Sequence, residues 1–272
     1  MSKAHVMSIG TGKGGSDIEL PRVFDTPYRP EVIQKVYVNL RSHTYQRQGR
    51  YPAAGEMVSA ESRNTGLGIA RLARARGEGF SRAGQAASVA GVRHGRVAHP
   101  PESWKNIYKK INKKERQLGL CSAIAATSRK DLVEKRGHVL SDKTSLPLVV
   151  SNEIESITKT KDLKKALVDI GIGDDLARAA VTRKARSGTA RRRGREARVG
   201  TSALVVVGNQ AKLTQLTRSV SGVDVKQVKD ISVLDLAPGS KPIRLTVFSE
   251  NALVQMKNFQ STINKVMELT NK

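Results

Sequence analysis

The chain has 272 residues, of which 48 are lysine or arginine and 24 are aspartate or glutamate, so its formal net charge at pH 7 is +24. This excess of positive charge is typical of proteins that bind nucleic acid or another anionic surface. Hydrophobic residues make up 38% of the chain, which is enough for a core and argues against disorder throughout. No apolar run approaches the roughly 20 residues that span a bilayer, and residues 1–12 lack a signal-peptide pattern, so we expect neither membrane insertion nor export.

The N-terminal part of the chain has the patterns of a strand, a turn and a helix. Residues 5–9 are interpreted as a strand, and the glycine-rich residues 10–15 as a turn after it. Val32, Val36 and Leu40 then recur at helical spacing, and Pro30 suits the first turn of a helix. We therefore expect an amphipathic helix over residues 30–45.

Residues 44–103 differ in composition from the rest of the chain. They contain nine arginines and no lysine, together with nine glycines and eleven alanines, and they show no helical or strand periodicity. A segment with so few large apolar residues cannot offset its own ordering entropy. We therefore expect an inserted arm that orders against a polyanion, with a flexible solvated linker as the alternative interpretation.

Regular patterns resume at residue 112. Asn112 followed by Glu115 predicts a capping box at the start of a helix over residues 112–128. The residues expected on the buried stripe of this helix are Leu118, Cys121, Ile124 and Ala125.

Strand and helix patterns alternate from residue 146 onward. Short apolar strands are predicted at residues 146–150, 203–207, 223–225 and 244–248. Helices are predicted at residues 160–170, 174–181 and 213–220, and after residue 249. Gly171 is expected to end the first of these helices, and Ser249 to cap the last. The unbroken β-branched run at 203–207 is typical of a strand that is buried on both faces, so the alternation predicts a parallel α/β sheet with right-handed crossovers.

One glycine motif imitates a nucleotide-binding site. Gly10, Gly12 and Gly15 have the spacing of the dinucleotide fingerprint and follow a predicted strand. The fingerprint works only when its third glycine opens a helix, and Pro21 and Pro27 leave no room for one of useful length. We therefore interpret the motif as a β-turn. No Gly-Lys pair is followed by Ser or Thr as a Walker A loop requires.

The sequence gives no positive evidence for catalysis or metal binding. His94 and His99 have no carboxylate or cysteine at ligand spacing, and no serine lies in a G-x-S-x-G turn. The single cysteine, Cys121, excludes an internal disulfide and suits a buried position in a helix. We predict no catalytic residue, no metal, no cofactor and no small-molecule substrate.

Two basic regions are predicted to contact RNA. Arginine binds phosphate with a planar fork and stacks on bases, so an arm with arginine but no lysine favours close RNA packing. A second basic stretch, residues 183–198, precedes a predicted core strand. Rings that could stack on unpaired bases are Tyr45, Tyr51, Phe80, Trp104 and Tyr108. The predicted RNA-binding residues are Arg47, Arg50, Arg63, Arg71, Arg74, Arg76, Arg82, Arg93, Arg96, Trp104, Lys105, Lys109, Lys110, Arg183, Lys184, Arg186, Arg191, Arg192, Arg193 and Arg195.

Several long stretches resemble one known family. They are "LPRVFDTPYRPEVI" at 20–33, "GIARLARARGEGFSRAGQ" at 68–85, "GRVAHPP" at 95–101, "KKERQLGLCSAIAATS" at 113–128, "EKRGH" at 134–138 and "DLAPGSKPIRLTVFSENAL" at 235–253. In order and wording, the chain closely resembles the universal large-subunit ribosomal protein four family in its archaeal and eukaryotic form. It departs from the family pattern at Leu67, where arginine is frequent, and at Ala73, where proline is frequent.

The resemblance implies both an architecture and a role. The architecture is a three-layer α/β/α domain with a mostly parallel sheet, formed by residues 1–43 and 104–272, plus a long non-globular loop over residues 44–103. The role is that of a structural constituent of the large ribosomal subunit in the cytoplasm, with large-subunit ribosomal RNA (rRNA) and neighbouring ribosomal proteins as partners. The loop would pass through rRNA to the peptide exit tunnel and meet the nascent peptide at its tip. The predicted tunnel-lining residues are Gly66, Leu67, Gly68, Arg71 and Arg74.

Two alternatives belong to other classes. The first is an RNA-modifying or nucleotide-dependent enzyme on a Rossmann-like sheet, which would bind a nucleotide without RNA. The second is a DNA-binding regulator, which lacks a helix-turn-helix or zinc pattern. Comparing the affinities for rRNA and duplex DNA at one salt concentration separates the second alternative from ribosomal RNA binding.

Overall fold

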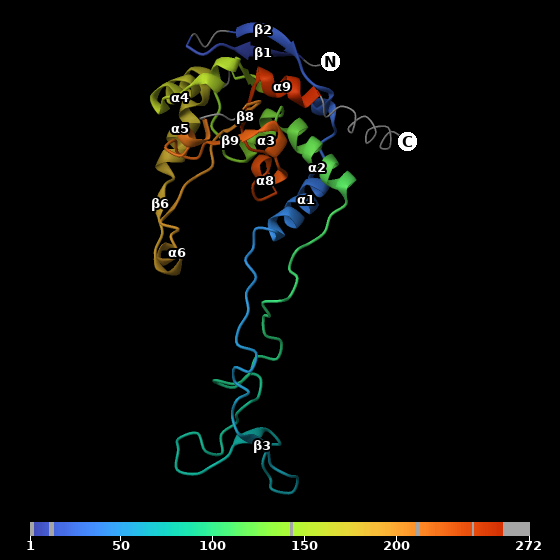
Figure 1. The fold of residues 1–272 in the computed structure, drawn as a ribbon, viewed down its shortest axis with the longest axis vertical. Helices are drawn as coiled ribbons and strands as arrows, with labels where there is room; N and C mark the ends of the chain where they lie inside the picture. The colour runs from blue at the N-terminus through green and yellow to red at the C-terminus, as the bar shows by residue number, and fades with distance from the viewer. Residues whose placement is uncertain (1–2, 11–13, 142–143, 210–212, 241, 258–272) are drawn as a thin grey trace. The chain divides into compact units, whose positions relative to one another are not determined.

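The computed structural model describes residues 3–10, 14–141, 144–209, 213–240 and 242–257 (Figure 1). The chain divides into two compact units. Residues 1–41 and 110–272 form one unit, which we call the body, and residues 42–109 form the other, which we call the arginine-rich unit.

The body contains a six-stranded sheet in the order β2-β1-β5-β10-β8-β9 (Figure 1). The strands are β1 Lys3–Met7, β2 Gly14–Glu19, β5 Leu148–Val150, β8 Leu204–Val207, β9 Asp224–Gln227 and β10 Thr246–Ser249. Among the described residues, β1 and β2 pair antiparallel, and every other neighbouring pair in this sheet is parallel. The predicted α/β class with a mostly parallel sheet is confirmed.

Helices cover both faces of the sheet. One face packs against η1 Arg22–Asp25, α1 Pro30–Ser42, α2 Lys113–Ala126, η4 Val228–Asp230, α8 Val233–Leu236 and α9 Glu250–Lys257. The other packs against α3 Lys130–Lys135, η2 Asn152–Ser156, α4 Thr160–Leu167, η3 Val168–Ile172, α5 Gly173–Val181 and α7 Leu213–Thr217. The body therefore has the three layers that the resemblance implied.

Strand β8 shows how this core is built. Its side chains alternate between the two apolar clusters, with Leu204 and Val206 in one and Val205 and Val207 in the other. All four side chains are fully buried. Because elements pack on both faces of the sheet, this strand has no solvent-facing side, which is why its sequence is an unbroken apolar run.

The predicted elements recur with small shifts at their ends. Helix α1 ends at Ser42, three residues earlier than predicted. Gly171 has a φ of +88° and breaks the helical path after α4, as predicted. Ser249 caps α9, because its Oγ accepts a 3.1 Å hydrogen bond from the Ala252 amide. The sequence analysis missed β2, α3 and α8.

The glycine-rich turn lies partly outside the described residues, which leave out 11–13. The segment that follows it is β2, which returns antiparallel along β1. A strand at this place excludes the helix on which a dinucleotide site depends, so that fingerprint is rejected on structural grounds as well.

The start and the buried face of α2 differ from the prediction. Asn112 precedes the helix as predicted, but its side chain makes no cap hydrogen bond. The Glu115 carboxylate accepts a 2.7 Å hydrogen bond from Lys35 Nζ. Leu118 and Cys121 are only half-buried, whereas Gly119 is buried against α1. A β-carbon at Gly119 would lie 2.7 Å from Val36 Cγ2. Small residues therefore mark the packed face, since they let the two helices approach closely.

Candidate nucleic-acid interface

The two ends of the arginine-rich unit run side by side. The Arg50 amide donates to Pro101 O at 3.2 Å, and Gly49 is so close to Ser103 that a β-carbon there would lie 2.7 Å from the Ser103 amide nitrogen. Nearby, the rings of His43 and Tyr108 stack with centroids 5.1 Å apart. The unit therefore begins and ends in one paired stem.

Farther along the unit, the chain forms a hairpin that the sequence analysis did not predict. Strands β3 (Ala60–Ser62) and β4 (Ala73–Ala75) pair antiparallel. The Ser62 hydroxyl donates to Arg71 O at 2.9 Å across the connecting loop. Every residue from 61 to 72 is exposed. Gly66, Leu67 and Gly68 lie in this loop, and the two glycines have φ values of +93° and +67°.

A third segment extends the hairpin beyond β4. The amides of Ala75 and Ala87 donate to Gln85 O and Ala73 O, each at 2.9 Å. The Arg74 side chain lies across this layer, where its Nη1 donates to Gly84 O at 2.9 Å. Arg74 Nε is buried and has no partner among the described residues.

The arginine-rich unit has order without a core. No residue from 43 to 109 is buried, although the backbone hydrogen bonds above define one path for the chain. Large apolar side chains stay in contact with solvent, including Met57 at 75% and Leu67 at 58% exposure. Hydrogen bonds open to water contribute little net stability, so this path gains little stability from the chain itself.

The nine arginines of residues 44–103 fall into two groups. Five bond within the unit: Arg47 lies over the Tyr108 ring, Arg50 donates to Ala54 O, Arg74 to Gly84 O and Arg82 to Arg93 O, and Arg76 pairs with Glu61. The other four make no side-chain hydrogen bond or ion pair among the described residues; they are Arg63, Arg71, Arg93 and Arg96. The second group leaves guanidinium donors fully available to an external anion.

The rings of this unit are open to solvent. Trp104 is 64% exposed, Tyr51 62%, Tyr45 54% and Phe80 47%. Lys105 and Lys109 on the returning segment, and Lys110 at the start of the body's second segment, are also exposed. Cations and rings thus share the accessible surface.

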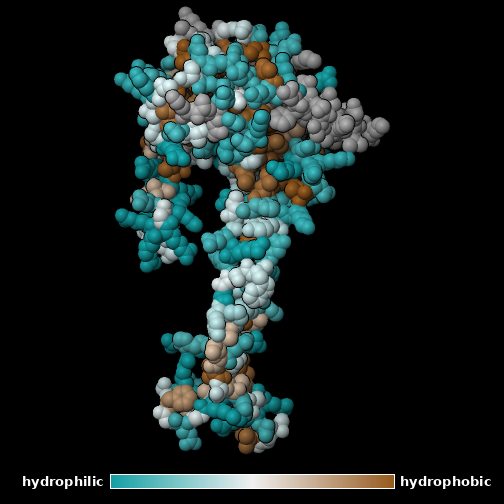
Figure 2. All heavy atoms as spheres, in the orientation of Figure 1, coloured by the Kyte–Doolittle hydropathy of each residue, from teal (hydrophilic) through white to brown (hydrophobic). Residues whose placement is uncertain are grey.

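The second basic stretch forms a hairpin in the body. Strands β6 (Lys184–Ala185) and β7 (Ala197–Arg198) pair antiparallel, and α6 (Gly188–Arg192) lies between them. Figure 2 shows a hydrophilic surface over this hairpin. The exposed cations are Arg183, Lys184, Arg191, Arg192, Arg193, Arg195 and Arg198, and Arg186 is half-buried. The sequence analysis located this charge but missed the hairpin, because strands of two residues carry no periodicity.

A buried carboxylate holds both ends of this basic hairpin. Asp175 on α5 accepts hydrogen bonds from Arg178 Nε at 2.9 Å and from Ser202 Oγ at 2.6 Å. Arg178 Nη2 also donates to Thr201 O at 2.8 Å, so the segment before β6 is joined to the segment after β7. Burial alone raises the pKa of Asp175, but hydrogen bonds from His138, Arg178 and Ser202 outweigh it and hold that pKa below its ordinary value.

His138, Asp175 and Ser202 do not form a catalytic triad, although the residue types match one. His138 Nε2 accepts from the Leu245 amide at 3.3 Å, so its Nδ1 carries the proton and donates to Asp175 Oδ2 at 3.1 Å. Ser202 also donates to Asp175 rather than to His138. All three residues are buried. No base lies beside the serine, and the burial of all three residues keeps a substrate away from them. The network therefore has a structural role, since it connects segments of the body.

The chain is similar to known ribosomal proteins. A profile described as "Ribosomal protein L4/L1 family" matches residues 18–259. The chain belongs to this family.

Three archaeal proteins named "Large ribosomal subunit protein uL4" illustrate the similarity. The one from Methanosphaera stadtmanae is 40% identical over 94% of this chain and 96% of its own length. The Haloquadratum walsbyi protein is 38% identical over 90% of this chain and 95% of its own length. The Methanococcus vannielii protein is 40% identical over 91% of this chain and 95% of its own length. The expected archaeal form of the family is confirmed.

Two stretches that carry the family resemblance have structural roles in the body. Arg244 is 2% exposed and donates to the Ser202, Ala203 and Gly222 carbonyls. Arg136 Nη1 donates to Pro238 O at 2.7 Å. These cations satisfy carbonyls at loop ends and are not exposed for RNA. Sequence reasoning missed this because a basic residue in a basic chain gives no signal of burial.

The remaining predictions on chemistry concern cysteine, metal and membrane. Burial raises the pKa of the Cys121 thiol to about 11, which makes it a poor nucleophile. The described residues contain no cluster of three or more potential metal ligands. No helix in the described part of the chain combines the length and apolar content needed to cross a membrane.

Proposed function

We propose that this chain is a structural constituent of the large ribosomal subunit that binds large-subunit rRNA. One observation carries the proposal: residues 43–109 follow a defined backbone path without a single buried residue. A polyanion packed around the unit supplies the burial and the charge compensation that the chain lacks. Membership of the ribosomal protein L4/L1 family supports this partner. The chain has no catalytic role in this account, and it acts in the cytoplasm.

The two basic regions, residues 44–103 and the β6–β7 hairpin, would bind RNA in different ways. In residues 44–103, nine arginines stand against four glutamates, and the glycines let the backbone approach phosphates. The β6–β7 hairpin presents its arginines from a short, anchored element. Neutralising about ten phosphates would make the affinity fall on the order of a hundred-thousand-fold between 50 and 200 mM salt.

The β3–β4 hairpin loop is the proposed tip of an RNA-penetrating loop, residues 44–103. Its exposed residues Gly66, Leu67, Gly68 and Arg71, with Arg74 beside them on β4, would line the peptide exit tunnel and meet the nascent peptide. Gly66, Leu67, Gly68 and Arg71 are exposed and available for such contacts. Arg74 is half-buried and would have to release Gly84 O to use all its donors there. The body would lie among neighbouring ribosomal proteins.

Sedimentation tests the proposal. The native protein should travel with large subunits from a cell lysate through a moderate salt wash. Replacing Arg191, Arg192 and Arg193 by glutamine should weaken binding of the purified chain to large-subunit rRNA. The slope of log affinity against log salt concentration should become shallower by about one for each lost phosphate contact.

A matched control removes the same charge elsewhere. Lys161, Lys164 and Lys165 on α4 are exposed, and their replacement by glutamine also lowers the net charge by three. This variant should keep most of the affinity, because its lysines lie outside the proposed interface. Equal losses in the two variants would mean that only net charge matters, and free protein that never sediments with subunits would refute the proposal.

A further inference from the structure

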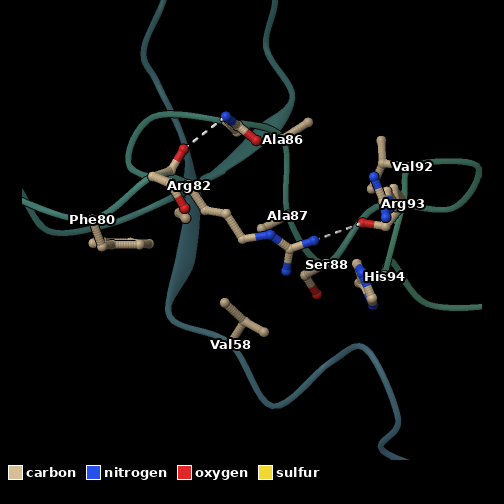
Figure 3. A pocket seen from close by; sticks show the side chains of 12 residues that line it. Val58, Phe80, Arg82, Ala86, Ala87, Ser88, Val92, Arg93 and His94 are labelled. Carbon is tan, nitrogen blue, oxygen red and sulfur yellow. Dashed lines mark hydrogen bonds between the residues drawn. The ribbon is translucent and has the colours of Figure 1, made fainter.

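The arginine-rich unit contains a cleft that is lined by arginines, one aromatic ring and small apolar side chains. The cleft has a volume of about 660 Å³, within the range of small-molecule sites. Figure 3 shows Arg82 crossing the view between Phe80 on one side and Ser88 and His94 on the other. Small apolar side chains, Ala75, Ala86, Ala87, Val58 and Val92, also line the cleft.

The charged and aromatic groups of this cleft suit one class of ligand. Arg82, Arg93 and His94 are its potentially cationic residues, and no carboxylate lines it. Phe80 is 47% exposed, so about half of its side chain is accessible to a ligand. A nucleobase could stack on the aromatic ring beside the apolar lining, and its attached phosphate could accept hydrogen bonds from the guanidinium groups.

The backbone around the cleft is held in an unusual form. Ser88 and His94 have φ values of +58° and +61°, the left-handed region that few non-glycine residues adopt. Two hydrogen bonds fix the walls: Arg82 Nη2 to Arg93 O at 3.5 Å, and Gln85 Nε2 to Ser81 O at 2.9 Å (Figure 3). Such backbone geometry clusters at ligand sites, where the surroundings impose it.

Gly77 leaves space for the ring of Phe80. It has a φ of +100°, and a β-carbon there would lie 3.2 Å from Phe80 Cε1. The ring therefore rests against a position that only glycine occupies without strain. The position next to Gly77 is one edge of the ring, Cε1 and Cδ1, and the Phe80 side chain stays 47% exposed.

We infer that this cleft receives a single unstacked nucleotide of rRNA, with its base on Phe80 and its phosphate on Arg82 and Arg93. This inference rests on the proposed rRNA-binding function and adds a defined subsite to it. Base stacking on an aromatic side chain tolerates every base, so the ring selects an unpaired nucleotide rather than a sequence.

Chemical probing of purified full-length protein on deproteinised large-subunit rRNA tests the site. The wild-type chain should protect one unpaired nucleotide from base-specific reagents in a way that depends on Phe80. Phe80→Ala should expose that nucleotide, leave the remaining footprint in place and weaken rRNA affinity about tenfold. Phe80→Trp should restore the protection, because it restores a stacking surface.

Controls separate the site from general effects. Tyr51→Ala removes a more exposed ring of the same unit, at 62% against 47% for Phe80, that lies outside the cleft, and it should leave that nucleotide protected. In each variant, the midpoint temperature of thermal unfolding should equal that of the wild type, because the body is unchanged. An unchanged footprint for Phe80→Ala, or full protection by Phe80→Leu, would overturn the nucleotide site. Wild-type protein that fails to bind the rRNA would overturn the proposed function itself.

Discussion

The body and the arginine-rich unit obtain their structures by different means. The body buries two apolar clusters, one on each face of its sheet, and side chains such as Val205 and Val206 are fully buried. The arginine-rich unit has comparable backbone hydrogen bonds but no buried residue between 43 and 109. Hydrogen bonding defines a path in both, whereas burial makes a structure stable on its own only in the body.

Charge follows the same division. In the body, Asp175 and Arg244 are buried and each has several hydrogen-bond partners. In the arginine-rich unit, Arg63 and Arg71 are exposed and have no side-chain partner in the described chain. A charge with its partners inside the chain supports the fold, and one without them is available to an external ligand.

Deletion of residues 60–90 should have the largest effect: it should leave the stability of the body unchanged and remove most of the affinity for rRNA. With a short Gly-Ser linker in their place, the body should unfold cooperatively within about 0.5 kcal/mol of the intact chain, because no core residue is lost. Affinity for large-subunit rRNA should fall at least about a hundred-fold, since five arginines and the hairpin are removed. Chemical unfolding and filter binding measure these effects. Loss of cooperative unfolding would show that the units depend on each other.

Asp175→Asn should cause the largest loss of stability from one side chain. It should lower the free energy of unfolding by about 3 kcal/mol or more at pH 7, because Arg178 then keeps a half-buried charge without its carboxylate. The folded-state pKa of Asp175 is below its ordinary value of 3.8, so its contribution is complete above that pH and disappears as pH falls toward the lower folded pKa.

Urea unfolding between pH 7 and pH 3 checks the direction of this effect. The gap between wild type and Asp175→Asn should be constant down to about pH 5 and then narrow. Asp174→Asn is the matched control, because its carboxylate is exposed one residue earlier, and it should cost less than about 0.5 kcal/mol. A gap that widens in acid would contradict the assignment of the network.

The same substitution at one leucine of each unit compares how much side-chain burial stabilises the two units. Leu204→Ala in β8 should cost about 2 to 5 kcal/mol, because its side chain is fully buried. Leu67→Ala in the β3–β4 loop removes the same atoms from a 58% exposed side chain and should change the free energy of unfolding by less than about 0.5 kcal/mol. Equal costs would reveal burial at Leu67 in the free protein.

Gly119→Ala should give a smaller loss, on the order of 1 to 2 kcal/mol, because the added methyl meets Val36 Cγ2 at 2.7 Å. Val36→Ala in the same chain should recover part of that loss by making room. A double-mutant cycle by urea unfolding measures the coupling, and strictly additive effects would contradict the close α1–α2 contact.

Sequence patterns predict the body well and the details of the basic regions poorly. The run at 203–207 and the cap at Ser249 were predictable because periodicity and capping follow from burial and from local hydrogen bonding. The predicted capping box was wrong on both sides: the Asn112 side chain makes no cap hydrogen bond, and the Glu115 carboxylate pairs with the distant Lys35. The buried face of α2 was predicted in part: Ile124 and Ala125 are buried, whereas Leu118 and Cys121 are only half-buried. The prediction missed Gly119, which lies where α1 and α2 approach closely.

The basic regions defeat pattern reasoning for a physical reason. Their strands have two or three residues, as in β3 and β6, so no period is visible. Composition locates the charge. Only the three-dimensional contacts separate Arg74, whose side chain donates to Gly84 O, from Arg63, whose side chain has no partner among the described residues. Composition also does not bring Phe80, Arg82 and His94 together around one cleft.

Amide hydrogen exchange on the free protein and on the intact large subunit tests the central claim most directly. In the free protein, the amides of β8 and β10 should be strongly protected, whereas those of Ala75 and Ala87 should exchange at nearly unprotected rates, because no core covers their hydrogen bonds. In the subunit, both sets should be protected. Protection of Ala75 and Ala87 in the free protein to the level of β8 would contradict the account.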